Sequence, residues 1–238
     1  MEIHRFSPSL LNRYDSCPLA FKYSFDELPE VEIDDSKAEL GAELHRQIAF
    51  YLRALRNDIT EEQIQGLSRQ AFGEAIKGKD HKANIIRNFL SYDEQRRSQT
   101  KHIKPDLVEA KLYADLFPSF PQFVTIVDAY WRADETCIDR KTGSATELND
   151  HAILQGTIES LVLKANDHPL QHHLFVYLGN NRTYETPMLS EGELKKQCLT
   201  LLDSIKVGHF PKKPSGLCRN YCKYVIRCEF EGVCLWQL

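Results

Sequence analysis

Two aspartates and a lysine lie on adjacent segments, residues 122–131 and 135–141, that we expect to be β-strands. If Ala133 and Asp134 form the loop of a hairpin, Asp128 lies directly opposite Asp139, and Lys141 points to the same face. Opposed carboxylates repel each other, and a divalent cation such as Mg²⁺, which prefers carboxylate oxygens, is the simplest compensation. A neighbouring lysine can orient a water molecule, so the pattern suits phosphodiester hydrolysis. The alternative is a solvent-facing polar surface with an Asp139–Lys141 ion pair.

Four of the seven cysteines lie close together near the end of the chain, at Cys218, Cys222, Cys228 and Cys234. Thiolates at such spacings select zinc or an iron–sulfur cluster. Zinc bound by these four residues is the local interpretation, and four unligated cysteines are the alternative to any metal.

Cys137 and Cys198 have the pattern of small core residues, with Cys137 on the strand face opposite Asp139. The same strand pattern continues upstream, where Glu109 alternates with apolar neighbours. We interpret Glu109 as part of a solvated strand face.

The composition bounds the class of protein. The 238 residues carry a formal net charge of −4, with 42% hydrophobic and 27% charged residues. These values are typical of a globular protein and exclude a disordered chain or a generally basic DNA-coating protein. We find no apolar segment of membrane-spanning length and no signal-peptide pattern near Met1, so we expect a cytoplasmic protein that does not bind a membrane.

Charge is unevenly distributed along the chain. Residues 26–39 hold seven acids and one lysine, which predicts a solvated loop that faces away from nucleic acid. Residues 206–227 hold six basic residues and no acid. This segment is the best candidate for contact with a DNA backbone, with Tyr221 and Tyr224 able to stack on bases.

The hydrophobic periodicity predicts a helical first part followed by a sheet with further helices, an α/β or α+β domain. A short helix is expected from Ser7 or Ser9 to Cys17. Later helices are expected at residues 37–56, 60–77, 82–98, 149–165 and 190–207, and strands at 107–116, 122–131, 135–141, 172–179 and 182–188.

The ordered set of motifs resembles the PD-(D/E)XK nuclease superfamily, in particular its RecB-like branch. Asp128 followed by Ile138-Asp139-Arg140-Lys141-Thr142-Gly143 is similar to the branch's lone aspartate and its D-x-K-T-G segment. Gly41-Ala42-Glu43-Leu44-His45 resembles its helical G-x-x-x-H. Ser7-Pro8-Ser9-Leu10 and Cys17-Pro18-Leu19-Ala20-Phe21-Lys22-Tyr23 resemble the N-terminal motif of the iron–sulfur members, which include CRISPR-associated exonucleases and AddB-type nuclease domains.

The resemblance implies a restriction-endonuclease-like fold, a central mixed sheet flanked by helices. It implies a single nuclease domain over 1–238, mainly helical in 1–100 and with its core sheet and helices in 105–207. The segment 208–238 would be the iron–sulfur part, packed with Cys17.

The resemblance also implies a metal-dependent DNA nuclease, an exonuclease acting on single-stranded or end-processed DNA. His45, Asp128, Asp139 and the Arg140 carbonyl would bind Mg²⁺ or Mn²⁺, and Lys141 would position the water. Partners of such enzymes are helicases, recombinases or the CRISPR adaptation machinery. The alternatives are a non-catalytic DNA-binding or scaffolding protein with a degenerate nuclease fold, and a zinc-bound interaction module.

Three positions qualify the resemblance. Gln155 matches the start of the family's Q-x-x-x-Y motif, which contacts DNA, but Glu159 replaces the tyrosine. Thr125 replaces a glycine three residues before the strand aspartate. Glu109 matches an acidic residue that members often carry on the preceding strand, where it would contribute to a second metal or to a water contact.

For the cysteines, the resemblance implies a structural [4Fe–4S] cluster held by Cys17, Cys218, Cys222 and Cys228. Cys234 is the alternative fourth ligand. Such a cluster would join the two ends of the chain and take no part in hydrolysis.

Overall fold

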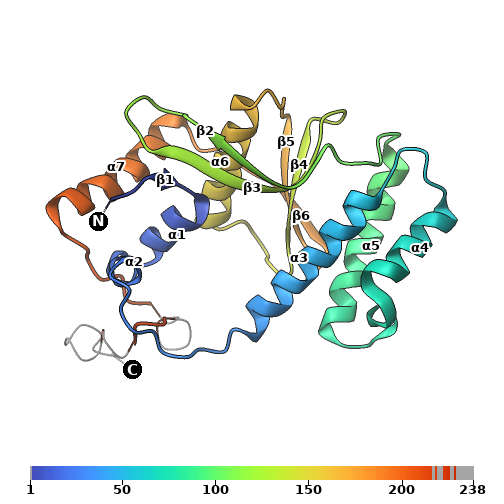
Figure 1. Ribbon diagram of the computed structural model, residues 1–238, viewed down its shortest axis with the longest axis horizontal. Coiled ribbons are helices and arrows are strands. Elements are labelled where there is room, and N and C mark those ends of the chain that lie inside the picture. Colours follow the sequence, from blue (N-terminus) through green and yellow to red (C-terminus); the bar gives the residue numbers. More distant parts are fainter. Residues whose placement is uncertain (1, 216–217, 219–221, 226–227, 229–238) are drawn as a thin grey trace. The chain divides into compact units, whose positions relative to one another are not determined.

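The fold is described from a computed structural model of the chain (Figure 1). The structure describes residues 2–215, 218, 222–225 and 228. The chain divides into two compact units. We call Ser36–Met188 the sheet unit, and Met1–Asp35 with Leu189–Leu238 the terminal unit. Among the described residues, no helix combines the length and the hydrophobicity needed to cross a bilayer.

The sheet unit begins with helices and continues with strands on either side of one further helix. Its elements are α3 (Ser36–Ala54), α4 (Glu61–Phe72), the 3-10 helix η1 (Gly73–Lys77), α5 (His81–Gln99), β2 (Leu107–Ala114), β3 (Gln122–Trp131), β4 (Thr136–Lys141), α6 (Asp150–Ala165), β5 (His172–Tyr177) and β6 (Arg182–Glu185).

The strands of this unit form a mixed sheet. β2 pairs with β3, β3 with β4, and β5 with β6, all antiparallel, whereas β4 and β5 are parallel. Parallel neighbours need a crossover connection, and α6 lies between them in the chain. The mixed sheet with flanking helices confirms the predicted fold class.

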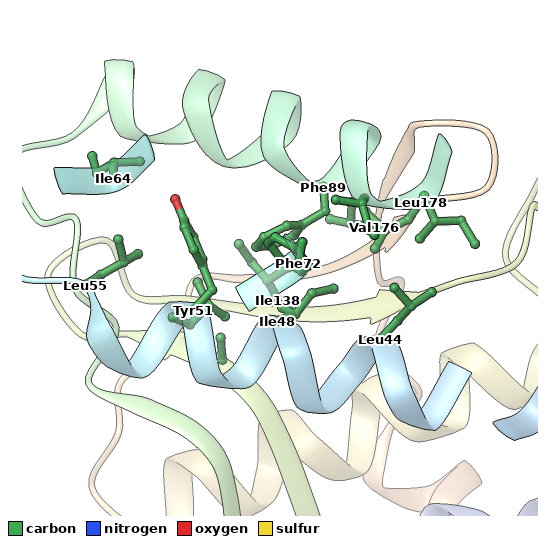
Figure 2. Packing of buried hydrophobic residues seen from close by; sticks show 14 of the residues in the cluster. Leu44, Ile48, Tyr51, Leu55, Ile64, Phe72, Phe89, Ile138, Val176 and Leu178 are labelled. Carbon is green, nitrogen blue, oxygen red and sulfur yellow. The ribbon is translucent and has the colours of Figure 1, made fainter. Parts of the chain in front are cut away.

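Helices α3, α4 and α5 share a hydrophobic core with one face of the sheet, and α4 packs against α3 (Figures 1 and 2). Leucine, isoleucine and aromatic side chains recur at helical spacing along α3, so one stripe of that helix is buried. Buried members of the core include Leu44, Ile48, Tyr51, Phe72, Phe89, Ile138 and Val176.

Helix α6 packs on a second, smaller core with Val127, Tyr130, Cys137 and Leu163. The prediction that Cys137 faces away from Asp139 is wrong, because residues two apart on a strand share a face. Cys137 is fully buried beside α6, and the Asp139 charge acts on its thiol.

Local signals explain where the helices of the sheet unit begin. The Thr60 side chain accepts a hydrogen bond from the Gln63 backbone, and the Gln63 side-chain oxygen accepts one from the Thr60 backbone, forming a capping box. Asp80 and Asn149 cap α5 and α6 in a similar way.

The terminal unit contains β1 (Arg5–Phe6), α1 (Pro8–Ser16), α2 (Pro18–Phe25) and α7 (Glu191–Val207). Ser7 caps α1, as predicted. The chain resumes a helix directly after Cys17, which ends α1 and begins α2. The sequence analysis did not identify α2, although Pro18 suits a first helical position.

Candidate active site

The hairpin of β3 and β4 has the predicted register. Ala129, Tyr130 and Trp131 pair with Ile138, Cys137 and Thr136, respectively. Asp128 and Asp139 are the next residues along these strands, just beyond the paired segment. The Asp128 carboxylate accepts a hydrogen bond from the Arg140 backbone at 2.8 Å, so it binds β4 where the strand pairing ends.

The pairing of β2 with β3 is interrupted beside Asp128. Val108 pairs with Ala129 and Ala110 with Val127, and Glu109 lies between them with a φ of 49°. This left-handed conformation is rare for a residue other than glycine, costs about 1–3 kcal/mol, and persists only where its surroundings enforce it. Ala129 belongs to the core beneath α3 and Val127 to the core beneath α6. These two residues, which would share a face in a regular strand, therefore point to opposite faces here.

A histidine and two carboxylates meet at this interruption. The His45 Nδ1 atom of α3 lies 3.5 Å from the Asp128 carboxylate and 3.7 Å from the Glu109 carboxylate. Their three ligand atoms all lie within 4.8 Å of one another. The side chains are 31%, 13% and 30% exposed, respectively, so a cation from solvent can reach them. Glu109 therefore lies within this group, where the sequence analysis favoured a solvated face.

Asp139 and Lys141 form an ion pair at 2.9 Å on β4, and Asp139 is only 2% exposed. The pKa of Asp139 is raised to about 6, mainly by burial and also by the Asp128 charge, while Lys141 opposes both. Burial also raises the pKa of Asp128, although His45 lowers it. The site therefore gathers negative charge where water solvates it poorly.

The pKa values of the two basic groups, His45 and Lys141, are both raised by nearby carboxylates. The Glu109 carboxylate is the main cause that raises the pKa of His45, against the effect of burial. Burial alone would lower the pKa of Lys141, but Asp139 reverses this, and the net change is upward. Lys141 therefore stays charged at neutral pH.

Gln155 of α6 lies directly beside this ion pair. Its Oε1 atom accepts a hydrogen bond from Lys141 at 2.9 Å. Its Nε2 atom donates to Asp139, and to Glu159 at 2.8 Å. The structure thus brings together His45, Glu109, Asp128, Asp139, Arg140, Lys141 and Gln155, all in the sheet unit.

Sequence reasoning missed the residues behind Gln155. Glu159 is paired with His173 on β5, and His173 with Thr186. Glu159 was noted only as a replacement for tyrosine. The sequence feature that could have indicated them is one polar residue within each of two largely apolar stretches, Glu159 in α6 and His173 in β5.

The terminal unit holds a separate cavity of about 560 Å³. Its lining includes Cys17, Cys218, Cys222 and Cys228. None of the described cysteines is in a disulfide. Cys234 lies outside the described residues, as does Tyr221 of the predicted DNA-contacting segment.

The acidic residues 26–39 do not all face away from the basic segment. Lys223 lies 3.2 Å from the Glu30 carboxylate and 3.6 Å from the Asp35 carboxylate. The Tyr224 hydroxyl donates to Glu30 at 2.8 Å. Two residues predicted to contact DNA are therefore engaged by acids within the terminal unit.

Comparison with known proteins identifies the class to which this fold and site belong. The family model of the PD-(D/E)XK nuclease superfamily matches residues 5–229, so the chain belongs to this superfamily of nucleases. No curated protein gives a match. Among solved structures, one described as "Crystal structure of SSO0001" is 12% identical, with 96% of this chain and 87% of that chain covered and a TM-score of 0.42.

Proposed function

We propose that this chain is a metal-dependent deoxyribonuclease whose active site lies where β2, β3, β4 and α3 meet. The observation that carries the proposal is the grouping of His45, Glu109 and Asp128 beside the Asp139–Lys141 pair. A solvated polar surface would not bury Asp139 to 2% exposure or raise its pKa to about 6.

The donor set suits a hard divalent cation. His45, Asp128, Asp139 and the Arg140 carbonyl would hold Mg²⁺ or Mn²⁺, which would supply Lewis-acid activation of water and of the phosphodiester. The Asp128 carboxylate is already oriented by the Arg140 backbone. The raised pKa values of Asp128 and Asp139 support the fit, because a cation relieves the repulsion and desolvation that cause them.

Lys141 is the proposed catalytic residue that orients the attacking water. It stays protonated, and Asp139 and Gln155 hold its ammonium group from two sides. A charged donor held in this way can also stabilise negative charge that develops on the phosphate. A direct contact of Gln155 with DNA remains part of the proposal.

The finer activity that we propose is exonuclease cleavage of single-stranded or end-processed DNA. It rests on the resemblance to the iron–sulfur exonucleases and on the basic residues of the C-terminal segment. Lys212 is exposed and could contact a DNA backbone, whereas Lys213 forms an ion pair with Asp15 at 3.1 Å. A helicase, a recombinase or the CRISPR adaptation machinery would be the matching partner.

We further propose that the terminal unit holds a structural [4Fe–4S] cluster. Four thiols line one cavity, and they come from the α1–α2 junction and the C-terminal segment. Cysteine thiolates are the ligands that such clusters prefer. The cluster would join these two parts of the chain. The zinc alternative requires Cys234 as a ligand.

The test of the proposed activity combines three purified variants on end-labelled single-stranded DNA with Mn²⁺. We expect Asp139→Ala and Lys141→Ala to abolish cleavage while circular dichroism shows a folded protein. Lys111→Ala is the matched control, because Lys111 is an exposed lysine on β2. Retained cleavage in both site variants would overturn the proposal. Iron content and visible absorption after anaerobic purification test the cluster separately.

A further inference from the structure

A continuous chain of hydrogen bonds runs from the Lys141 ammonium into the interior of the sheet unit. Lys141 donates to Gln155 at 2.9 Å, and Gln155 donates to Glu159 at 2.8 Å. The other oxygen of Glu159 lies 2.8 Å from the His173 Nε2 atom. The His173 Nδ1 atom lies 2.9 Å from the Thr186 hydroxyl. The chain therefore links β4, α6, β5 and the residue after β6.

The inner members of this chain are closed to solvent. The Glu159 and His173 side chains are 1% and 0% exposed. Neither side chain can touch DNA in this arrangement, so Glu159 cannot make the surface contact of the tyrosine that the family motif has at this position. Their hydrogen-bonded connection to Lys141 passes through Gln155, and the Glu159 charge also raises the pKa of Lys141.

The partners of Gln155 define the orientation of its amide. Its Nε2 atom faces two carboxylates, Asp139 and Glu159, which accept hydrogen bonds when ionised. Its Oε1 atom faces the Lys141 ammonium, which only donates. A flipped amide would place an oxygen against both carboxylates and its NH₂ group against the ammonium. Glu159 thus adds to the preference for the orientation that presents Oε1 to Lys141.

His173 and Thr186 hold Glu159 in place. With Glu159 ionised, the His173 Nε2–H group donates to it, and neutral His173 accepts from the Thr186 hydroxyl through Nδ1. Gly156 leaves space for this contact. A Cβ atom at that position would lie 2.8 Å from the Thr186 hydroxyl and 2.9 Å from the His173 Nδ1 atom.

The same region also contains a set of potential metal ligands. Cys137, Glu159 and His173 each offer a ligand atom, and these atoms lie within 4.8 Å of one another. However, Glu159 uses both oxygens and His173 both nitrogens in hydrogen bonds of ordinary length. Burial raises the pKa of the Cys137 thiol, which disfavours the thiolate that a metal needs. The hydrogen-bond network accounts for these side chains without a metal.

We propose that Glu159, held by His173 and Thr186, is a positioning residue that orients the Gln155 amide and, through it, the Lys141 ammonium. This inference rests on the proposed nuclease function. It assigns to Glu159 an interior role in place of the surface contact of the family tyrosine.

The first test compares three variants of the full chain in steady-state cleavage of end-labelled single-stranded DNA with Mn²⁺. Glu159→Leu removes both acceptors, and we expect kcat to fall by the order of 10²-fold at unchanged KM. Glu159→Gln can still accept from Gln155 if His173 changes tautomer, so its kcat should stay within about threefold of the wild type. Ser160→Ala is the matched control, because Ser160 is buried on α6 and its hydroxyl donates to the Gly156 carbonyl of the same helix.

The second test requires no activity and separates this inference from the proposed function. The NMR signals of the Gln155 side-chain amide, assigned by their loss in Gln155→Leu, should shift in Glu159→Leu and stay in place in Ser160→Ala. Unmoved signals, or equal kcat in folded Glu159→Leu and wild type, would overturn the inference. If Glu159→Leu does not fold, Glu159→Gln takes its place. In that case, a Glu159→Gln variant that loses activity as fully as Lys141→Ala would overturn the inference. Stoichiometric zinc lost in both Cys137→Ser and Glu159→Gln would also overturn it.

Discussion

The raised pKa of Asp139 predicts how the stability of the metal-free protein depends on pH. Burial is the main cause of the rise from 3.8 to about 6. A carboxyl group with a higher pKa in the folded state binds its proton more tightly there than in the unfolded chain. Its contribution to stability is therefore present at low pH, and it is lost as the pH rises from about 4 through about 6.

The magnitude follows from the size of the shift. Each pKa unit corresponds to about 1.4 kcal/mol, so the complete effect is roughly 3 kcal/mol. Between pH 5 and pH 7.5, where the protein is easier to study, the expected loss is roughly 1 kcal/mol. Asp139→Asn removes the titrating group but keeps the shape of the side chain. The Asp139–Lys141 ion pair forms only when Asp139 is ionised, and its effect is already contained in the raised pKa of Asp139.

The assay is urea unfolding of wild type and Asp139→Asn in EDTA, at several pH values between 5 and 7.5. The free energy of unfolding of the wild type, minus that of the variant, should decrease as the pH rises. A saturating concentration of Mn²⁺ should reverse this trend in the wild type, because the ionised carboxylate then binds the cation. A difference that is constant or increases with pH in EDTA would refute the reasoning.

Three further predictions concern single side chains. Glu109→Gln keeps the side-chain shape but removes a charge, so Mn²⁺ affinity measured by calorimetry should fall about tenfold, and unchanged affinity would exclude Glu109 from the site. Gly156→Ala forces a methyl group against Thr186 and His173, and urea unfolding should show a loss of about 1–3 kcal/mol; an equally stable variant would contradict this packing. Cys17→Ser should lower iron content and visible absorption after anaerobic purification, whereas full occupancy would remove this residue from the ligand set.

Much of the fold follows from periodicity and local signals. Residues 122–131 are rich in β-branched and aromatic residues and predict β3 with its observed bounds, and the predicted hairpin register is confirmed for Ala129, Tyr130 and Trp131. Both features depend on neighbours in the chain, which a sequence shows directly. The family assignment is confirmed by the match over residues 5–229.

The remaining features depend on contacts between distant segments. Glu109 alternates cleanly with apolar neighbours in the sequence, and this alternation does not reveal its positive φ, although the family pattern indicates a metal or water contact for it. His173 and Glu159 each look like an isolated polar residue. Only the parallel pairing of β4 with β5 and the packing of α6 bring them together.

The interruption of the sheet at Glu109 explains how one site can use residues from both of its faces. In a regular strand, Asp128 would share a face with Tyr130, beneath α6, while His45 belongs to α3 on the opposite face. Side chains no longer alternate regularly between the two faces beside Ala129. The Asp128 carboxylate can therefore contact both His45 and the Arg140 backbone. The backbone strain therefore has a geometric consequence: it brings a helical histidine from one side of the sheet to the carboxylates and lysine that α6 supports from the other.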